Sequence, residues 1–433
     1  MQVNLNNKYG NKFVTNKNDK AIFLFFGLAM WLVIPILGIF PLLFFVHLNR
    51  KPHSKLNYLV CLLIVLTITI FVSSLDVISD LAVYIDNYEY LAKKNPFEIS
   101  GGKGLEFVMW VVSYPIYVLT NGSRYAFIFF WSFVFNAITF FVIVKGFSPR
   151  NYGLLLLFIV ATPNFLGYQG FLVRQYLATI IFLVAVVNLE NKLVFWSIYL
   201  FSLFAHVANL LYLPAALLYD KVKILYSKTI RILFVLAGLT LTFSTSVIFD
   251  LAQLLQKVLP GQYGAAILAK TYRYSREQTA SEDLGIAFVE HLLIFSIVIF
   301  LVRYQQMQSD KERLLIFSYP IFLFLMFIGR NVHLFSNRFA FILFPFTGLF
   351  YYLLIEFDWK FGKRSILTLL LVGKMLYFSY FLVSIDRGDI AFNYMDNRAL
   401  SSNVFDYIES AYDGFTDDIK IKELPTDRSV TGS

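Results

Sequence analysis

Long apolar runs recur along almost the whole chain, and this feature constrains the fold most. A helix of roughly 18 apolar residues or more is long enough to cross a bilayer. The chain is also 58% hydrophobic and only 15% charged, unlike a soluble domain of 433 residues. The sequence therefore predicts an all-α polytopic membrane protein of about 12 transmembrane helices with short re-entrant or interfacial helices. The runs lie at 21–48, 56–79, 123–144, 150–168, 171–189, 193–219, 229–249, 285–303, 314–330, 334–356 and 365–385, with a shorter one at 105–119.

The polar residues divide the chain into three parts. Residues 1–20 form a polar N-terminal tail, 21–385 a single membrane domain, and 386–433 a polar C-terminal tail. Two polar stretches inside the membrane domain, 76–104 and 250–284, are too long to be simple connections. We expect the second of them to be one sizeable extracytoplasmic loop.

Composition and motifs also exclude several classes of function. The net charge of +9 is typical of cytoplasmic loops that meet anionic lipid headgroups, so it does not indicate nucleic-acid binding. The single cysteine, Cys61, rules out a disulfide within the chain. The sequence has no metal-binding motif and no glycine-rich phosphate loop. We therefore expect neither a metal nor another cofactor.

Basic residues between the apolar runs predict the cytoplasmic side of the protein. All of them share one side if 105–119 dips in or lies flat without crossing, and if 193–219 is a hairpin that turns near His206. In a second scheme both segments cross once, which moves Lys145 and Arg150 outside. The basic residues are Arg50, Lys51, Lys55, Lys145, Arg150, Lys192, Lys221, Lys223, Lys228, Arg231, Arg303, Lys311, Arg313, Lys360, Lys363 and Arg364.

The first apolar run, 21–48, is open to two interpretations. The lysines before residue 21 favour a cytoplasmic N-terminus, which requires the run to double back at Pro35–Gly38. A single crossing would place those lysines outside.

Three arginines lie within or between apolar helices. Arg174 interrupts the run FLVRQYLATII, and Arg330 and Arg338 flank a junction between two runs. An ionised guanidinium costs about 2.5–3.5 kcal/mol at the centre of a membrane helix, so it usually faces a cavity or a partner. A single arginine could form an interhelical ion pair or snorkel to the interface. Three together indicate an anionic, lipid-linked ligand, because arginine binds phosphate in a bidentate manner.

A stripe of acidic and aromatic residues follows the second apolar run. Asp80, Tyr84 and Tyr88 are spaced to share one helical face, and Asp86 and Tyr90 form a second such pair. Aromatic rings stack on sugars, and a carboxylate accepts hydroxyl hydrogen bonds or a proton. The alternative is an interfacial tyrosine belt with a solvated acidic face.

Further polar residues fall on the same predicted outer side. Glu106 opens the segment 105–119, where a carboxylate often serves only as a helix cap or dipole partner. Gln175 follows Arg174, and His206 lies at the predicted hairpin turn, where it is either a catalytic or a structural residue. His333 lies between Arg330 and Arg338, and Arg273 lies in the loop 250–284.

The order of these motifs resembles the EpsG family of Wzy-type polysaccharide polymerases. The resemblance rests on Asp80-Leu-Ala-Val-Tyr84, Glu106, Arg174-Gln175 and Phe204-Ala205-His206, and it covers roughly residues 21–220. The later half matches in hydropathy and in a late membrane arginine, here Arg338. Many members carry Gly-Thr-Asp or Pro-x-x-Asp before the tyrosine. This chain has Val77-Ile78-Ser79-Asp80 instead, which leaves Asp76 as an alternative to Asp80.

The resemblance implies a metal-independent glycosyltransferase, inverting or retaining, in the bacterial inner membrane. Its substrates would be an undecaprenyl-diphosphate-linked oligosaccharide donor and acceptor, polymerised on the extracytoplasmic face. A chain-length regulator protein is a possible partner. A lipid-linked oligosaccharide flippase and an O-antigen ligase are the alternatives. A flippase would be expected to show internal repeats, which the sequence lacks.

The expected roles of the site residues follow from this chemistry. A lipid diphosphate leaving group needs cations where negative charge develops, and the acceptor hydroxyl needs a base. The candidate base is Asp80, Asp86 or His206, with Asp80 first because it shares a face with two tyrosines. The diphosphate-binding candidates are Arg174, Arg338, Arg330 and Arg273, and the substrate-binding candidates are Tyr84, Tyr88, Glu106, Gln175 and His333.

Overall fold

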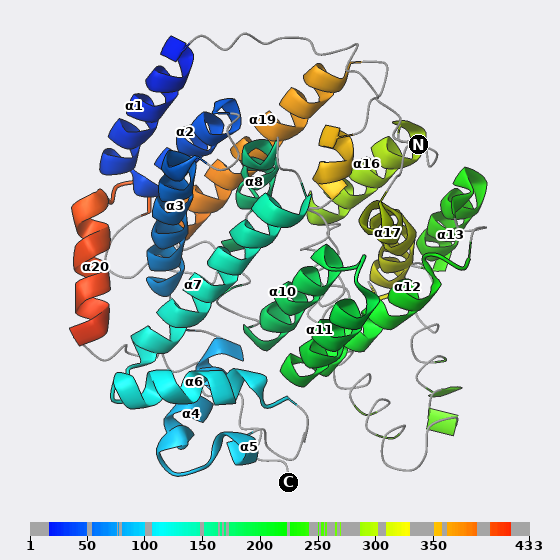
Figure 1. Cartoon of the computed structure of the whole chain (residues 1–433), viewed down its shortest axis with the longest axis horizontal. Helices are drawn as coiled ribbons and strands as arrows, with labels where there is room; N and C mark the ends of the chain where they lie inside the picture. Colours follow the sequence, from blue (N-terminus) through cyan, green and yellow to red (C-terminus); the bar gives the residue numbers. More distant parts are fainter. Residues whose placement is uncertain are drawn as a thin grey trace.

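The fold is helical throughout the part of the chain that the computed structural model describes (Figure 1). The described residues contain no strand and include several apolar helices, so the predicted all-α membrane architecture is confirmed for them. The count of about 12 spans and the extracytoplasmic loop 250–284 stay predictions. The described residues are 17–49, 54–75, 77, 80–99, 106–147, 151–162, 165–166, 169, 173–222, 226–241, 250, 253–254, 256–257, 265, 269, 286–301, 309–329, 350–356, 362–387 and 399–416.

The helices follow one another with short connections in the first half of the chain. They are α1 (Lys17–Val33), α2 (Pro35–Leu48), α3 (Lys55–Ser73), α4 (Asp80–Glu89), η1 (Tyr90–Ala92), α5 (Pro96–Ile99), α6 (Val108–Leu119), α7 (Arg124–Val142), η2 (Ile143–Phe147), α8 (Tyr152–Val160), α10 (Val173–Val187), α11 (Lys192–Ala205), η3 (Val207–Tyr212), α12 (Leu213–Leu218), α13 (Lys228–Leu241), α16 (Ile286–Leu301), α17 (Asp310–Gly329), α19 (Lys363–Arg387) and α20 (Val404–Thr416).

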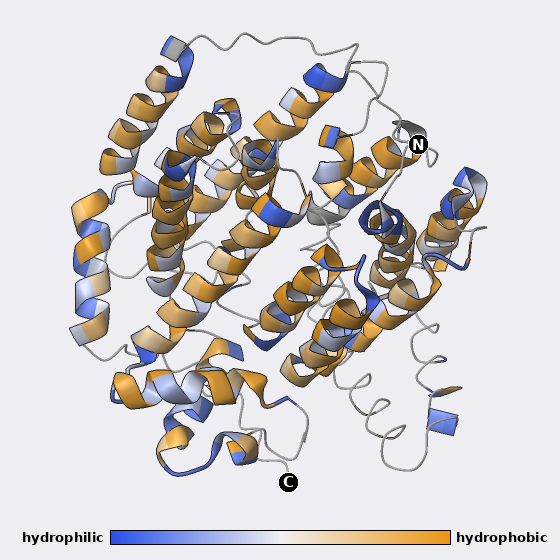
Figure 2. Cartoon of the chain, in the orientation of Figure 1, coloured by the Kyte–Doolittle hydropathy of each residue, from blue (hydrophilic) through white to orange (hydrophobic). Residues whose placement is uncertain are grey.

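Three helices in the described part of the chain are long and apolar enough to cross a membrane. They are Lys55–Ser73, Arg124–Phe147 and Lys363–Arg387. Figure 2 shows hydrophobic residues along most of their length, while hydrophilic residues gather at helix ends and along α4 and α20. Hydrophilic ends around apolar centres are typical of helices that cross a bilayer.

The run 21–48 folds as two antiparallel helices, α1 and α2. The rings of Phe23 and Phe44 lie 5.0 Å apart between centroids. Closer to the turn, a Cβ on Gly38 would lie 2.4 Å from the Cα of Trp31, so only glycine permits this approach. Pro35 begins α2, where its missing N–H costs no helical hydrogen bond. Of the two interpretations of this run, the structure has the one that doubles back.

The run 193–219 also doubles back. Helix α11 ends at Ala205, His206 is extended with φ −160° and ψ 126°, and η3 and α12 lead the chain away again. The Nζ of Lys192 and the hydroxyl of Tyr219 lie 2.5 Å apart, so the two ends of the segment meet. The segment is thus a hairpin that turns at His206, as the sequence predicts.

Several basic residues gather at one end of the molecule, here named the basic end. The ion pairs Lys192–Asp310 (3.1 Å) and Arg313–Asp220 (3.5 Å) join α11, α17 and the end of α12. The Nζ of Lys311 donates to the carbonyl of Gly146 at 3.3 Å, which adds the end of α7. The opposite end, where α4–α6 lie, is named the α6 end (Figure 1). His206 lies at this end, beside Glu106.

Helix α6 lies across the lower end of α7 in Figure 1. The indole N–H of Trp131 in α7 donates to the hydroxyl of Ser113 in α6 at 3.0 Å. With 12 residues α6 is about 18 Å long, too short to cross a hydrocarbon core of about 30 Å. That the segment 105–119 does not cross the membrane stays a prediction.

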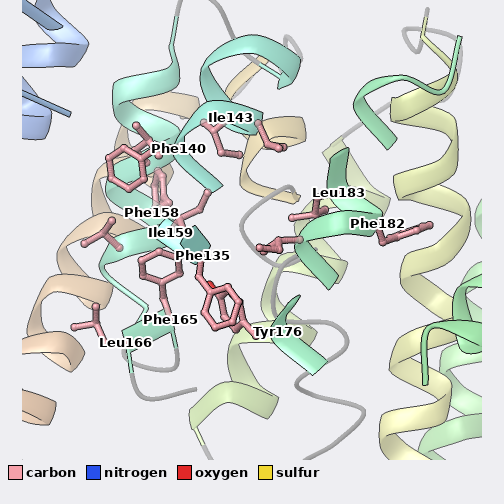
Figure 3. Packing of buried hydrophobic residues seen from close by; sticks show 14 of the residues in the cluster. Phe135, Phe140, Ile143, Phe158, Ile159, Phe165, Leu166, Tyr176, Phe182 and Leu183 are labelled. Atoms are coloured by element: carbon pink, nitrogen blue, oxygen red, sulfur yellow. The ribbon is translucent and has the colours of Figure 1, made fainter. Parts of the chain in front are cut away.

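Buried aromatic rings pack α7, α8 and α10 together (Figure 3). The rings of Phe135 and Tyr176 lie 4.8 Å apart. The side chains of Asn136 and Gln169 exchange two hydrogen bonds of 2.9 Å, which fixes the chain shortly before α10. Directional bonds of this kind orient helices inside a membrane, where apolar burial alone does not. The start of α10, which carries Arg174, is therefore held firmly against α7.

Part of the C-terminal tail docks on the membrane domain as helix α20. The hydroxyls of Ser74 and Ser410 lie 2.8 Å apart, and Phe415 packs on Tyr125 with 4.9 Å between ring centroids. A Cβ on Gly414 would lie 2.4 Å from the Tyr125 ring. The stretch predicted as a polar tail thus includes an amphipathic helix in close contact with α3 and α7.

Candidate functional site

The carboxylate of Glu106 accepts three hydrogen bonds at the α6 end. Its Oε2 accepts from the Nη1 of Arg174 at 2.6 Å. Its Oε1 lies 2.5 Å from the Nδ1 of His206 and accepts from the backbone N–H of Val207 at 3.1 Å. Glu106 thus binds two segments that lie about 70 and about 100 residues after it in the sequence, rather than capping α6 alone.

Burial and partner charges act on Glu106 in opposite directions. Its side chain is 6% exposed, and this burial by itself raises the pKa of the carboxyl group. The hydrogen bond from His206 and the charges of His206 and Arg174 outweigh burial and lower the pKa of Glu106 to about 2. An ionised carboxylate only accepts hydrogen bonds, so the Nδ1 of His206 carries the proton. In the neutral form of the ring, the Nε2 is then an acceptor.

Arg174 keeps donor capacity that its neighbours do not use. Its guanidinium lies over the ring of Tyr84, 5.1 Å from the centroid, and it interacts electrostatically with Glu106 and Asp80. Its Nε is buried and has no hydrogen-bond partner among the described residues. A buried donor without a partner costs about 1–3 kcal/mol. The side chain is 22% exposed, so a bound anion could supply the acceptor.

The break between α11 and η3 brings His206 to Glu106. α11 ends at Ala205, and the backbone of His206 turns away from the helix axis. The ring of Phe204 packs on Phe107 at 5.4 Å between centroids, next to Glu106. The side chain of His206 is 16% exposed, so a ligand can reach it.

The cluster of Glu106, Arg174 and His206 lies below the outermost level of the helices. α10 has 15 residues and α11 has 14, whereas α7 with η2 runs for 24. At 1.5 Å per residue, α10 and α11 are about 21–22 Å long. Since their other ends meet α7 and α17 at the basic end, the cluster falls short of the end of α7.

The predicted Asp80–Tyr88 stripe forms one helix, α4, but its residues have different surroundings. Asp80 and Tyr84 lie beside Arg174 and belong to the cluster region. Tyr88 is fully buried against Tyr117 and Phe127, with 5.2 and 4.7 Å between centroids. The stripe therefore brings two of its predicted site residues to the cluster.

Other predicted site residues lie farther away or outside the described residues. Asp86 is exposed on α4. Gln175 is buried in α10 next to Arg174. The predictions for Arg273, Arg330, His333 and Arg338 concern residues that lie outside the described part of the chain.

A second buried ionic cluster, which the sequence did not reveal, lies in the middle of the molecule. The Nζ of Lys374 in α19 lies 2.6 Å from the Oε1 of Glu290 in α16, and 2.6 Å from the hydroxyl of Thr162. The hydroxyl of Tyr351 donates to the same carboxylate oxygen at 2.6 Å. The signal in the sequence was a lysine within the apolar run 365–385.

Groups of side chains that could bind a metal ion are absent from the described part of the chain. There, no three or more His, Cys, Asp and Glu side chains gather in a way that could hold a metal ion. The Glu106 cluster is instead a carboxylate that organises a cation and an imidazole.

The comparisons with known proteins give one match. Residues 59–396 match the EpsG family, and this range includes Glu106, Arg174 and His206. No curated protein and no solved structure matches the chain. The match covers most of the sequence and confirms the resemblance seen in its motifs. The chain belongs to the EpsG family of Wzy-like membrane proteins of the polysaccharide-polymerase type.

Proposed function

We propose that this protein is a metal-independent glycosyltransferase that polymerises oligosaccharide repeat units carried on polyprenyl diphosphate. Family membership supports a polysaccharide polymerase in the membrane. The observation that carries the finer proposal is the cluster of Glu106, Arg174 and His206, which pairs an anion-binding group with a proton acceptor.

The basic end is the cytoplasmic side in this proposal. Lysines and arginines accumulate in cytoplasmic loops, and Lys192, Lys311 and Arg313 lie together at that end. The α6 end then faces the outside of a bacterial inner membrane. This orientation places the cluster where lipid-linked repeat units are polymerised.

Arg174 binds the diphosphate of the donor. A guanidinium forms paired, charge-assisted hydrogen bonds with phosphate oxygens. Glu106 holds Nη1 in place, and Nε has no acceptor among the described residues, which supports this role. Charge that develops on the leaving diphosphate is stabilised by such a fixed cation.

His206 is the base. Glu106 fixes the proton on Nδ1, so Nε2 is free to take a proton from the acceptor hydroxyl. Glu106 itself, with a pKa of about 2 and both oxygens occupied, is a poor base near neutral pH. Asp80 is the alternative base, since it also lies near Arg174.

In the reaction, the acceptor hydroxyl oxygen attacks the anomeric carbon of the donor sugar. The bond between that carbon and the diphosphate oxygen breaks, and its electron pair leaves with the lipid diphosphate. The hydroxyl proton passes to the base. The stereochemistry at the anomeric carbon is either inverted or retained.

The lipid-linked glycans that accumulate without this protein test the proposal. Loss of long chains with single repeats retained on the outer face supports the polymerase. Accumulation of finished polymer that is not transferred to its final acceptor would indicate a ligase. Repeats trapped on the cytoplasmic side would indicate a flippase. Expression of the Glu106→Gln variant in cells that lack the protein should not restore the long chains. The folded protein is then present, but its Glu106 cluster is broken.

A further inference from the structure

The side chain of Asn209 joins the elements that carry the cluster without belonging to it. Asn209 lies in η3, three residues after His206, and is 1% exposed. Its Nδ2 donates to the carbonyl of Ala178 in α10 at 2.7 Å and to the hydroxyl of Ser202 in α11 at 3.0 Å. The backbone carbonyl of Asn209 accepts from the hydroxyl of Tyr199 at 3.0 Å.

These bonds begin one helical turn from the site residues. Ala178 follows Arg174 by four positions on α10, and Ser202 precedes His206 by four on α11. The backbone N–H of Asn209 also donates to the carbonyl of His206 at 3.2 Å, which closes the first turn of η3. The position of Asn209 therefore determines where His206 lies relative to Arg174.

The neighbouring aromatic contact cannot do this alone. One turn further on, Phe182 and Tyr212 stack with 4.3 Å between centroids and 1° between planes. Parallel rings hold two elements at a fixed separation but slide past one another at little cost. Hydrogen bonds are directional, so the amide of Asn209 fixes the register of η3 along α10.

We propose that Asn209 is a positioning residue for the base. Its amide holds η3 so that the imidazole of His206 and the N–H of Val207 both reach Glu106. Asn209 lies behind the cluster and touches no substrate. The inference rests on the proposed function, because it assigns Asn209 a role in the turnover step that Glu106 and His206 perform.

The test replaces Asn209 by aspartate in the full-length chain. Aspartate has the same shape but no N–H donor, and its carboxylate faces the carbonyl of Ala178. With lipid-linked repeat units as substrate, we expect kcat to fall by about 10–10²-fold, because a displacement of about 1 Å has effects of that size. We expect KM for the donor to stay within about 2-fold of wild type, since Arg174 stays on α10.

Asn188→Asp is the matched control. The Nδ2 of Asn188 also donates to a backbone carbonyl of α10, that of Val184, at 2.8 Å. Asn188 lies beyond the opposite end of α10, far from the cluster. We expect this variant to keep wild-type kcat and KM.

A combined variant separates positioning from general destabilisation. If Asn209 acts through the Glu106 contacts, Asn209→Asp should lower kcat by less than about 2-fold in a Glu106→Gln background. If the double variant lowers kcat by the product of the two fold-changes measured in the single variants, the inference is wrong. If Asn209→Asp fails to fold, Ser202→Ala removes only one acceptor of the amide, and kcat should fall by about 3-fold. An unchanged kcat in Ser202→Ala would then overturn the inference.

Failure of this inference differs from failure of the proposed function. If Asn209→Asp behaves like Asn188→Asp while Glu106→Gln and His206→Ala keep only a slow residual rate, at least about 10²-fold below wild type, only the role of Asn209 is wrong. If Glu106→Gln and His206→Ala both polymerise at the wild-type rate, the proposed site itself is wrong.

Discussion

Two buried ionic clusters in this protein use the same chemistry and differ in access. At the α6 end, Glu106 binds Arg174 at 2.6 Å. In the middle of the molecule, Glu290 binds Lys374 at the same distance. Each pair joins helices that are far apart in sequence, so an ion pair by itself does not identify a site.

The two clusters differ in the exposure of the cation and in whether all of its hydrogen-bond donors have partners. The side chain of Arg174 is 22% exposed, and within the described part of the chain its Nε has no hydrogen-bond partner. The side chain of Lys374 is 6% exposed, and its ammonium group contacts Glu290 and Thr162 and lies over the ring of Tyr351. Unused donors together with access indicate a ligand, whereas saturated donors indicate helix packing.

The largest effect is expected when one partner of the Glu290–Lys374 pair, here named the sealed cluster, is removed. Lys374→Met leaves the Glu290 carboxylate buried without its cation, which costs about 3–5 kcal/mol of folding free energy. The single cysteine, Cys61, is buried in α3 and becomes reactive on unfolding. A thiol-reactive dye therefore measures the loss as a lower unfolding midpoint.

The double variant Lys374→Met with Glu290→Gln is the control for this prediction. Removal of both charges should restore most of the midpoint and leave polymerisation active, because the pair holds helices together and binds no substrate. A stable but inactive double variant would show that the sealed cluster has a function of its own.

The next largest effect is expected at the cluster of Glu106, Arg174 and His206. Arg174→Lys keeps the charge but loses the planar fork of donors. Loss of a fixed donor at a developing charge usually costs about 10²–10³-fold in rate. Polymerisation by the purified variant should fall by that factor while the Cys61 unfolding midpoint changes little. Wild-type turnover by Arg174→Lys would remove the diphosphate-binding role.

The pH dependence of the folding stability tests the role of Glu106. Its pKa falls from 4.5 to about 2 on folding. A carboxyl group with a lowered pKa stabilises the fold fully above pH 4.5, and this contribution, about 3 kcal/mol, disappears as the pH falls towards 2. The stability difference between wild type and Glu106→Gln, followed by tryptophan fluorescence, should be constant above pH 5 and shrink below it. A difference that changes between pH 6 and 8 would contradict this assignment.

The smallest effect is expected from the ring beneath Arg174. Tyr84→Leu removes a cation–π contact worth about 0.5–2 kcal/mol. We expect donor KM to rise by about 2–30-fold, with the same change in Tyr88→Leu much smaller, because Tyr88 packs against Tyr117 and Phe127 instead. Equal effects of the two substitutions on KM would show that the stripe acts as a unit.

Periodicity and local signals predicted much of the fold. Polar residues at the centre of the run 193–219 indicated a hairpin, and Pro35 indicated where the first run doubles back. The amphipathic helix α20 was missed because a tail rich in Asp and Glu looks polar as a whole. Only its contacts with Ser74 and Tyr125 show which face is covered.

The sequence singled out Glu106, Arg174 and His206 as candidate residues, but it did not predict how they are arranged. Spacing placed Asp80, Tyr84 and Tyr88 on one face but could not say what covers each ring. Glu106 appeared as a capping residue, because its partners come from segments about 70 to 100 positions away. Partner choice of this kind depends on tertiary packing, and the same reason hid the pairing of Lys374 with Glu290.

The central claim is that Glu106 holds His206 as the base beside a diphosphate-binding Arg174. The most direct test compares His206→Ala with Asp80→Asn in a polymerisation assay with purified full-length protein and lipid-linked repeat units. We predict that His206→Ala lowers the rate by at least about 10²-fold, the lower limit for a positioned base, while Asp80→Asn loses much less. If Asp80→Asn builds no long chains and His206→Ala still builds them, the base is the aspartate and the account of the cluster is wrong.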